Sequence, residues 1–310
     1  MCKNDNPNQQ GGGPAAPLAI VTVTYSPGRH LGAFLESLPQ ATHRNVVTIM
    51  ADNGSTDGVP EAAARDNSTV VFLPTGGNIG YGGAINAAAN YLRPQREAGE
   101  IDSNFFLISN PDVEFLPGSI DRLLDCIESE PRAGAVGPRI EEADGSAYPS
   151  ARAVPNVVTG IGHALLSGVW PGNPFTKAYK DDADMDNKRV AGWLSGACLL
   201  VRWEAFEEVG GFDERYFMYM EDVDFGDRLT RAGWQSIFCP EARIMHDQGH
   251  SANKHSRVTV PAHHDSAYRF QADRHPYMWQ APLRAVLWLG LKARGYAQTL
   301  WASRTARRKA

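Results

Sequence analysis

Cysteine is scarce in this chain, and no two cysteines are close enough to form a CxxC pair. The 310 residues contain only Cys2, Cys126, Cys198 and Cys239, which are widely scattered. Small secreted domains carry closely spaced cysteine pairs, whereas scattered thiols of this kind stay reduced in the cytosol. We therefore expect a cytoplasmic protein whose thiols are free.

Long apolar runs, excess positive charge and a signal peptide are absent as well. The longest apolar run near the C-terminus, residues 285–291, is far shorter than the ~20 residues of a spanning helix. The formal net charge of −5 gives no support for nucleic-acid binding. Residues 1–17 are polar and then rich in Gly and Pro, so we expect a disordered leader there.

Two common nucleotide-binding fingerprints are also missing. A dinucleotide fold carries its glycine-rich turn directly after the first strand, but here TYSPGRH, residues 24–30, follows the first apolar run. The glycine-rich GGNIGYGG, residues 76–83, comes after the third apolar run, and a P-loop lysine with its Ser or Thr is not found. These absences weigh against a dehydrogenase and against an NTPase.

What the chain does contain is a regular alternation of apolar strands and helices. We expect strands at 18–25, 46–53, 69–74 and 105–109, and helices at 30–38, 80–92 and 118–130. Strands that are apolar throughout and separated by helices predict a mostly parallel α/β sheet covered on both faces. We assign residues 18–260 to this domain, with long loops within 141–192, and residues 261–310 to a helical basic tail.

Polar residues follow these strands at their carboxyl ends, where open parallel sheets bind ligands. They are Thr24–Ser26 after the first strand, Asp52–Asp57 after the second and Asn110–Asp112 after the fourth. Each piece alone is also an ordinary turn. Their joint placement, with the glycines of 76–83 at a helix start, favours a nucleotide site in which Asp52 accepts hydrogen bonds from a base or a ribose.

Six segments resemble, in order, the signature blocks of family 2 glycosyltransferases. They are VTVTYSPGRHLGAFLESL, ADNGSTDG, NIGYGGAINAA, ISNPDVEFLPGSI, WLSGACLLVRWEAFEEVGGFDERYFMYMEDVDFGDRLTRAGW and ARIMHDQGHS. The resemblance implies the GT-A fold, a single Rossmann-like nucleotide-sugar-binding domain. Within the family, the NPD spelling and the length are most similar to bacterial rhamnosyltransferases, and the basic tail to actinobacterial ones of cell-wall arabinogalactan linker synthesis.

The resemblance implies a metal site. Asn110-Pro111-Asp112 matches the family's Asp-x-Asp motif with Asn in place of the first carboxylate, so Asp112 would hold Mg²⁺ or Mn²⁺ against the donor's phosphates. His246 matches a late histidine that completes the site, and an imidazole ligand tilts the preference toward Mn²⁺. The alternatives are a plain turn that ends a strand, and a structural histidine.

The same resemblance assigns the substrate pocket. The positions matched around the nucleotide and its diphosphate are Thr24, Tyr25, Asp52, Ser55, Asp57, Asn78, Gly80, Gly83, Asn86 and Asn110. Trp193, Ser195 and Gly196 would line the sugar and acceptor side, although a Trp beside small residues is as often part of a core.

Glu221 and Asp222 matter most, because the resemblance makes Asp222 the general base of an inverting transfer. It would take the proton of the acceptor hydroxyl, and an Asp with an unperturbed pKa of about 3.9 is already ionised for this at neutral pH. Glu221 would orient the acceptor or support the helix start. The alternative is that both only complement the helix macrodipole, worth about 0.3–1 kcal/mol. We expect Asp224 and Asp227 to be surface or helix-supporting residues.

The implied donor is dTDP-L-rhamnose, and the implied acceptor is a polyprenyl-diphosphate-linked N-acetylglucosamine. Two alternatives stay open. One is the same fold with another donor, such as a UDP-hexose or UDP-galactofuranose, since thymine and uracil offer the same N3–H to Asp52. The other is a non-catalytic carbohydrate- or nucleotide-binding module.

The C-terminal charge suggests a membrane partner. Eight basic residues and no acidic one follow Asp273. A basic residue near an anionic leaflet contributes roughly 1 kcal/mol, so we expect the tail to hold the protein peripherally on the inner face of the plasma membrane. The alternative is a tail that contacts only the acidic surface of the protein itself.

Overall fold

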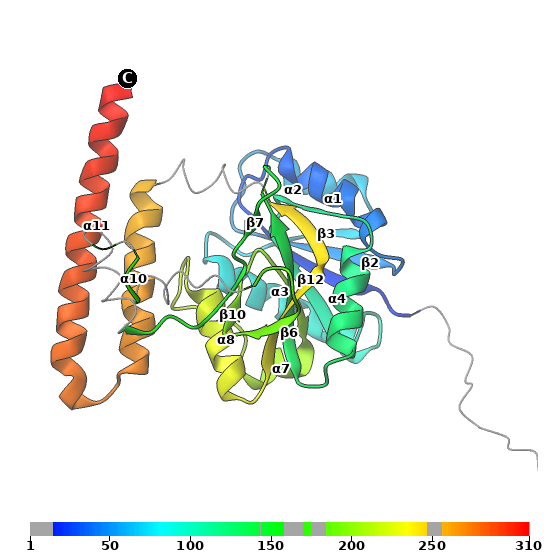
Figure 1. Cartoon of the computed structure of the whole chain (residues 1–310). Coiled ribbons are helices and arrows are strands. Elements are labelled where there is room, and N and C mark those ends of the chain that lie inside the picture. Colours follow the sequence, from blue (N-terminus) through cyan, green and yellow to red (C-terminus); the bar gives the residue numbers. More distant parts are fainter. Residues whose placement is uncertain are drawn as a thin grey trace, which may run out of the picture.

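The structure is a computed structural model of the chain. It describes residues 15–309 except 143, 158–169, 171, 175–183 and 247–255. An α/β domain with a central sheet lies beside a hairpin of two long helices (Figure 1).

The first half of the sheet is parallel. β1 (Leu18–Thr24) pairs with β2 (Val46–Asp52) on one side and with β4 (Phe105–Ser109) on the other, and β3 (Val70–Pro74) extends the sheet beyond β2. All of β1 and β4 is buried. The chain therefore leaves β1 in one direction and returns to its other edge, which makes a topological switch point, the usual ligand crevice of such sheets.

The second half of the sheet is mixed. β11 (Cys198–Arg202) runs antiparallel between β4 and β6 (Ala133–Glu141), β12 (Gln235–His246) is parallel to β6, and β5 (Val113–Phe115) closes the edge antiparallel to β12. The predicted mostly parallel α/β sheet is confirmed. Within the predicted loop region 141–192, the described residues also form short strands: β7 (Ala147–Tyr148), β8 (Ala151–Arg152) and β9 (Arg189–Ala191), with β10 (Trp193–Leu194) directly after them.

Helices cover both faces of the sheet, which explains why the strands are apolar throughout. They are α1 (His30–Ala41), α2 (Val59–Asp66), α3 (Tyr81–Glu97), α4 (Ser119–Glu128), α7 (Trp203–Glu208) and α8 (Glu221–Arg231). Alternate residues of β1 enter two cores: Leu18 and Ile20 pack with α1 and α4, and Ala19 and Val21 with α3. Among the described helices, none has the length and hydropathy to cross a membrane.

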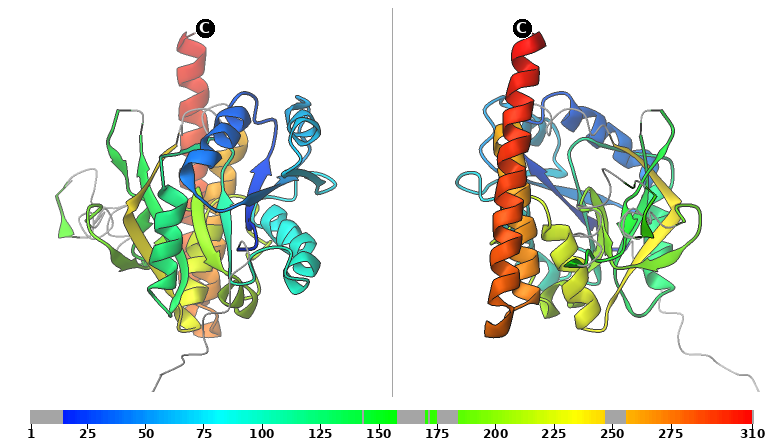
Figure 2. Two further views of the ribbon diagram at one scale, coloured as in Figure 1. Left: turned by 90° about the vertical axis from the view of Figure 1, so that its right-hand side faces the viewer. Right: turned by 60° about the vertical axis from the view of Figure 1, so that its left-hand side comes forward.

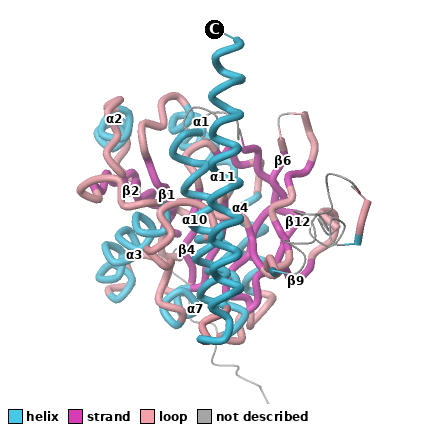
Figure 3. The backbone as a smooth tube through the Cα atoms, turned by 90° about the vertical axis from the view of Figure 1, so that its left-hand side faces the viewer, coloured by secondary structure: helices cyan, strands magenta, loops and turns pink. Residues whose placement is uncertain are grey.

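The C-terminal region forms a helical hairpin. α10 (Ser256–Arg274) is followed by a short 3₁₀ turn at Met278–Gln280 and by α11 (Ala281–Lys309). α10 lies between α11 and the sheet domain, and α11 is the outermost element on that side (Figures 1 and 3). In both views of Figure 2, α11 continues past the other elements toward the C-terminus. The expected boundary at residues 260 and 261 falls within α10.

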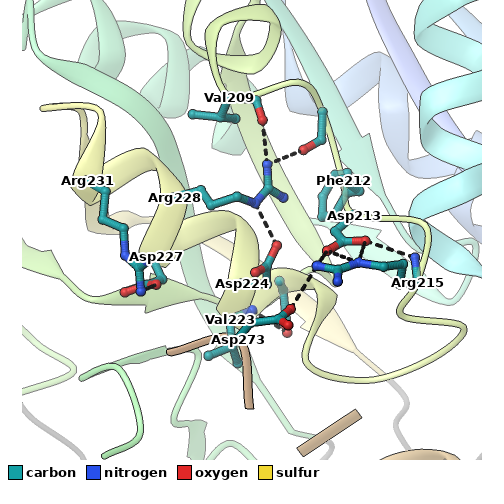
Figure 4. A network of polar contacts seen from close by, with 12 residues as sticks. Val209, Phe212, Asp213, Arg215, Val223, Asp224, Asp227, Arg228, Arg231 and Asp273 are labelled. Atoms are coloured by element: carbon teal, nitrogen blue, oxygen red, sulfur yellow. Dashed lines mark hydrogen bonds and ion pairs between the residues drawn. The ribbon is translucent and has the colours of Figure 1, made fainter. Parts of the chain in front are cut away.

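Charged contacts join α10 to α8 and to the loop before it (Figure 4). The Asp227 carboxylate lies 2.7 Å from Arg231 one turn along α8 and also pairs with Arg274 of α10. Arg215 binds Asp273 of α10 at 2.7 Å. The hairpin is therefore attached to the domain through α8.

A second carboxylate of α8 holds its helix to the preceding segment. Asp224 accepts a 2.6 Å hydrogen bond from Arg228 Nε, and Arg228 Nη1 donates 2.7 Å bonds to the carbonyls of Val209 and Gly211 (Figure 4). Asp224 and Asp227 are both buried. The expectation that they support the helix is confirmed, whereas a surface location is wrong, because each carboxylate is covered by its arginine partners.

We expect Arg274→Ala to destabilise the protein more than Arg231→Ala, although both remove a partner of Asp227. The Arg274 side chain is 29% exposed and Arg231 57%. Losing a shielded charged contact costs about 1.5–3 kcal/mol, while an exposed i,i+4 pair is worth about 0.3–0.5 kcal/mol. Urea unfolding of both variants measures the two free energies. Equal losses would mean that Arg274 does not attach the hairpin.

Candidate active site

Asp52 organises the loops at the ends of β1 and β2. Thr24 Oγ1 donates a 2.7 Å hydrogen bond to Oδ1, where the Ser55 hydroxyl also donates, and the N–H groups of Gly54 and Ser55 donate to Oδ2 at 3.0 and 2.9 Å. Burial opposes the charge of this carboxylate, but these hydrogen bonds outweigh it and lower the pKa of Asp52. Asp52 is thus a buried anion whose four acceptor positions are used by Thr24 of β1 and by its own loop.

Two further bonds tie the loop after β1 to the loop after β2. Ser26 N–H donates to Ser55 Oγ at 2.7 Å, and Gly28 N–H donates to Asp57 Oδ2 at 2.9 Å. Tyr25, directly before Ser26, has 58% of its surface exposed. The two loops therefore form one rigid wall beside the switch point, with the Tyr25 ring facing solvent.

The start of α3 lies against the segment that precedes α8. Asn78 Oδ1 accepts hydrogen bonds from Gly80 N–H at 3.1 Å and from Asn53 Nδ2 at 3.4 Å. Gly80 has φ of 83°, and a Cβ there would lie 2.5 Å from the Phe217 carbonyl oxygen. Only glycine fits this close approach of two backbones.

Two other predicted residues of α3 have their polar or packing contacts within the protein. Asn86 Nδ2 donates to the Phe212 carbonyl at 2.8 Å, and its Oδ1 accepts from the Phe212 N–H at 2.9 Å. Gly83 is buried, and a Cβ there would make ordinary contacts with Ile79. Both positions hold α3 in place, so their predicted contact with the diphosphate stays a prediction.

Asp112 and His246 come together at the edge of the sheet. β5 pairs with β12 so that His246 lies opposite Val113, and His246 Nε2 is 3.1 Å from Asp112 Oδ1. Asn110 Nδ2 is 3.5 Å from the same nitrogen, too far for a good hydrogen bond. His246 Nδ1 is buried and has no partner among the described residues. The pair thus offers one hard oxygen and one imidazole side by side.

Asp222 lies at the start of α8 and is held by backbone donors. Gly196 N–H donates to Oδ2 at 3.0 Å, and Val223 N–H donates to Oδ1 at 2.9 Å. The Tyr81 hydroxyl donates to the Gly196 carbonyl at 2.6 Å. Gly196 therefore links α3 to the acidic pair, and both Asp222 oxygens keep a free acceptor position.

The two neighbouring carboxyls of α8 perturb each other. Burial, and then the charge of Asp222, raise the pKa of Glu221 to about 8. Burial also raises the pKa of Asp222, although its two backbone hydrogen bonds work against the rise. The expectation of an unperturbed pKa for Asp222 is therefore wrong, because its carboxyl is partly buried and loses part of its hydration. Near neutral pH, Glu221 keeps its proton because its pKa is about 8, and the two backbone hydrogen bonds favour the negative charge on Asp222.

Tyr81 is the residue that the sequence reasoning did not single out. Its side chain is partly buried, and its pKa is raised first by burial and then by the charges of Glu221, Asp222 and, more weakly, Asp112. These carboxylates therefore surround one tyrosine. The only signal in the sequence was an aromatic residue between glycines at a helix start.

The metal-site candidates and the acidic pair are joined through the backbone. Asn110 N–H donates to the Ala197 carbonyl at 2.9 Å, and the preceding residue, Gly196, donates to Asp222. Trp193 and Ser195, from the same segment, have partners inside the protein: Trp193 Nε1 donates to the Ala153 carbonyl at 3.1 Å, and Ser195 N–H donates to Ser150. Trp193 is therefore partly buried and packs beneath α8.

α10 holds the strained loop that leads to Asp222. Tyr219 and Met220 have φ of 66° and 68°, a left-handed conformation that costs residues other than glycine about 1 kcal/mol or more. Ser266 Oγ donates to the Met218 carbonyl at 2.9 Å, and Phe270 packs into this loop. The C-terminal hairpin is thus a structural part of the candidate site.

Comparison with family models places this fold among known proteins. The model described as "Glycosyl transferase family 2" matches residues 19–183, and "Glycosyl transferase family group 2" matches residues 175–302. Together they span the sheet domain and most of the hairpin.

Similar curated proteins agree with these models. N-acetylglucosaminyl-diphospho-decaprenol L-rhamnosyltransferase of Mycobacterium tuberculosis is 50% identical over 94% of this chain and 96% of its own length. Rhamnosyltransferase WbbL of Escherichia coli is 28% identical over 64% of this chain and 72% of its own.

Two solved structures share the fold. One is the mannosyltransferase PcManGT from Pyrobaculum calidifontis in complex with GDP-Man and Mn2+, with a TM-score of 0.52 and 16% identity over 95% of this chain and 81% of that one. The other is GalNAc-T7 with UDP, GalNAc and Mn2+, with a TM-score of 0.54 and 16% identity over 75% and 44%. The chain therefore belongs to glycosyl transferase family 2 and is a glycosyltransferase with the GT-A fold.

Proposed function

We propose that this enzyme transfers L-rhamnose from dTDP-L-rhamnose to a hydroxyl of a polyprenyl-diphosphate-linked N-acetylglucosamine, with inversion at the anomeric carbon, in cell-wall linker synthesis. The observation that carries the proposal is the 50% identity to the mycobacterial rhamnosyltransferase over nearly the full length of both chains. The E. coli relative carries a rhamnosyltransferase name as well.

The donor nucleotide would lie in the crevice beside β1, against the wall formed by Asp52, Ser55 and Asp57. All acceptor positions of Asp52 are used by Thr24 of β1 and by its own loop, so it can accept a pyrimidine N3–H only if the Ser55 or Thr24 hydroxyl rotates away. We therefore assign Asp52 first to the shape of the pocket. The exposed Tyr25 ring offers a surface on which a base can stack.

Asp222 would act as the general base. Its carboxylate is oriented by the backbone N–H groups of Gly196 and Val223, which favour its ionised form, and each oxygen can still accept a hydrogen bond from an acceptor hydroxyl. Glu221 would keep its proton and donate a hydrogen bond to the acceptor or leave the helix start uncharged. This division of roles follows from the electrostatic repulsion between adjacent buried carboxylates.

The residues around Asp112 fit a divalent cation such as Mg²⁺ or Mn²⁺. A carboxylate oxygen and an imidazole nitrogen lie 3.1 Å apart, and this mixture suits Mn²⁺ at least as well as Mg²⁺. The described residues contain no group of three His, Cys, Asp or Glu that could hold a metal alone, so the donor phosphates would supply further oxygen ligands. When bound, the cation would stabilise negative charge on the leaving diphosphate.

A lipid-linked acceptor places the enzyme at a membrane. We propose that it is peripheral on the anionic inner face of the plasma membrane, and support comes from the absence of acidic residues after Asp273.

A donor panel tests the activity. The purified full chain is incubated with N-acetylglucosaminyl-diphospho-polyprenol and dTDP-L-rhamnose, a UDP-hexose or UDP-galactofuranose, and the lipid product is analysed by mass spectrometry. A deoxyhexose added only from dTDP-L-rhamnose is the expected result. Turnover with a UDP-sugar instead would identify that sugar nucleotide as the donor. Donor binding without any turnover would support a non-catalytic module.

Asp222→Asn should lower kcat by about 10²–10⁴-fold, because the amide keeps the shape but cannot accept the proton. The donor Kd should remain nearly unchanged. Glu221→Gln is the matched control, since glutamine resembles the protonated glutamic acid, and its kcat should fall much less. Near-normal turnover of Asp222→Asn, or a larger loss for Glu221→Gln, would assign the base elsewhere. Steady-state kinetics and donor titration give both quantities.

The raised pKa of Glu221 predicts a pH-dependent stability. The pKa of this carboxyl is near its ordinary value of 4.5 in the unfolded chain and about 8 in the folded protein. The folded state therefore holds an extra proton between these values, and stability decreases as pH rises through this window. Glu221→Gln should lose much of that decrease. Urea unfolding between pH 5 and 8, about the interval between the two pKa values, measures the free energy of unfolding of both proteins. If the two proteins lose stability in parallel over this range, Glu221 is ionised when folded.

Asp112→Ala should abolish metal-dependent donor binding and turnover, because it removes the carboxylate oxygen beside His246. Glu114→Ala, an exposed carboxylate two residues further on in β5, is the control and should behave like the wild type. Donor titrations with and without Mn²⁺ give the comparison. Full activity of the wild type in excess chelator would show that the Asn110-Pro111-Asp112 segment is a turn that binds no metal.

A further inference from the structure

Large apolar side chains are exposed along one side of the hairpin. We call this set the outer face: Tyr277, Met278 and Trp279 in the turn, and Val286, Leu289 and Tyr296 on α11. Met278 and Trp279 are 85% and 77% exposed. Single exposed apolar residues are common on soluble proteins, but a contiguous apolar patch marks an interaction surface.

The outer face is the side of α11 that points away from α10. Val286, Leu289 and Tyr296 are spaced by three and seven residues and so share one side of the helix. On the opposite side of α11 from Val286, a Cβ on Gly295 would lie 3.4 Å from the His264 ring of α10. Lys292 lies at the border of the outer face, three residues after Leu289, and its Nζ donates to Asp265 of α10 at 2.6 Å. Figure 3, which views the molecule from this side, shows α11 in front of α10 and of the sheet domain.

Most described basic side chains of the hairpin are bound to the protein itself. Arg274 pairs with Asp227, Arg284 donates to the carbonyls of His275 and Tyr277, and Lys292 pairs with Asp265. Arg294 is exposed. Within the described side chains of residues 274–296, three of the four basic residues are therefore engaged with the protein, and the large exposed side chains are mainly apolar and aromatic.

We propose that the outer face lies in the headgroup region of a phospholipid bilayer, with α11 parallel to the membrane plane. This inference rests on the proposed function, because an enzyme with a lipid-linked acceptor must act at the membrane that holds the acceptor. Tyrosine and tryptophan suit this location because each combines an apolar ring with a polar group. Lys292 and Arg294 in the middle of α11 favour a helix lying on the bilayer over one crossing it.

A second copy of the chain fits the outer face less well than a lipid surface does. A helical dimer seam would use one narrow stripe, but Trp288, also exposed, lies about 100° around the helix from Leu289. The turn with Tyr277, Met278 and Trp279 lies outside any helical seam. No carboxylate follows Asp273 to repel anionic lipid, and a broad apolar surface suits a fluid interface.

Vesicle cosedimentation of the full chain tests the proposal. Trp279→Ser and Leu289→Ser are made separately, and Val190→Ser, which changes an exposed residue of β9, is the control. Point variants are preferred to truncation after Asp273, because truncation also removes Arg274. On vesicles of phosphatidylcholine with phosphatidylglycerol, we expect wild type and Val190→Ser to bind and to remain largely bound in high salt. Each outer-face variant should bind about tenfold more weakly, as expected for one large apolar side chain withheld from an apolar phase.

Several outcomes would overturn the proposal. Binding that disappears in high salt and is unchanged in Trp279→Ser and Leu289→Ser would assign the contact to the basic C-terminal residues alone. A wild-type dimer in sedimentation velocity that Leu289→Ser converts to a monomer, without vesicle binding, would assign the outer face to a second copy. Turnover with a short-prenyl, water-soluble acceptor is measured in parallel: if it persists while vesicles are not bound, the inference fails and the proposed function stands. If vesicles are bound but no donor is used, the proposed function fails instead.

Discussion

Two neighbouring carboxyls, the buried Glu221 and the partly buried Asp222, lie at the start of one helix, and the repulsion between their charges constrains the rest of the site. Both cannot be ionised cheaply in such a place, so a single negative charge is shared between them near neutral pH. Two backbone N–H groups stabilise the charge on Asp222, while Glu221 Oε2 has no partner among the described residues. The asymmetry of hydrogen bonding therefore favours Asp222 over Glu221 as the carrier of the negative charge. A pair exposed to water would have no such preference.

The loop before the acidic pair is strained, and parts far apart in the sequence keep it in place. Gly80 allows α3 to approach the Phe217 carbonyl, while Ser266 and Phe270 of α10 hold the other side. The ion pairs of Asp227 and Asp273 then attach α10 to α8 and its preceding loop. Since strained conformations persist only when their surroundings over-determine them, the catalytic geometry depends on the hairpin as well as on the sheet.

The hairpin also joins the two proposed activities of the molecule. Its inner side contacts the loop that carries Asp222, and its outer face is apolar and uncovered by any described part of the chain. If the outer face rests on a bilayer, the same two helices position the acidic pair and set the orientation of the crevice relative to the membrane. The sugar of the acceptor could then reach Asp222 while its lipid chain stays in the bilayer.

Local pattern was enough to predict the architecture and to name most of the candidate site, because both follow from short segments. Buried strands such as Leu18–Thr24 are visible as apolar runs, and polar strand ends such as Asp52–Asp57 mark the ligand edge. The resemblance to family 2 then singled out Asp112, His246 and Asp222. The sequence could not show that the acceptor positions of Asp52 are used by Thr24 and its own loop or that Tyr81 lies near the carboxylates. Nor could it show that Arg274, Arg284 and Lys292 contact the protein itself. Hydrogen-bond partners, burial and charge pairing are set by residues far apart in the chain, and those distances exist only once the tertiary structure has formed.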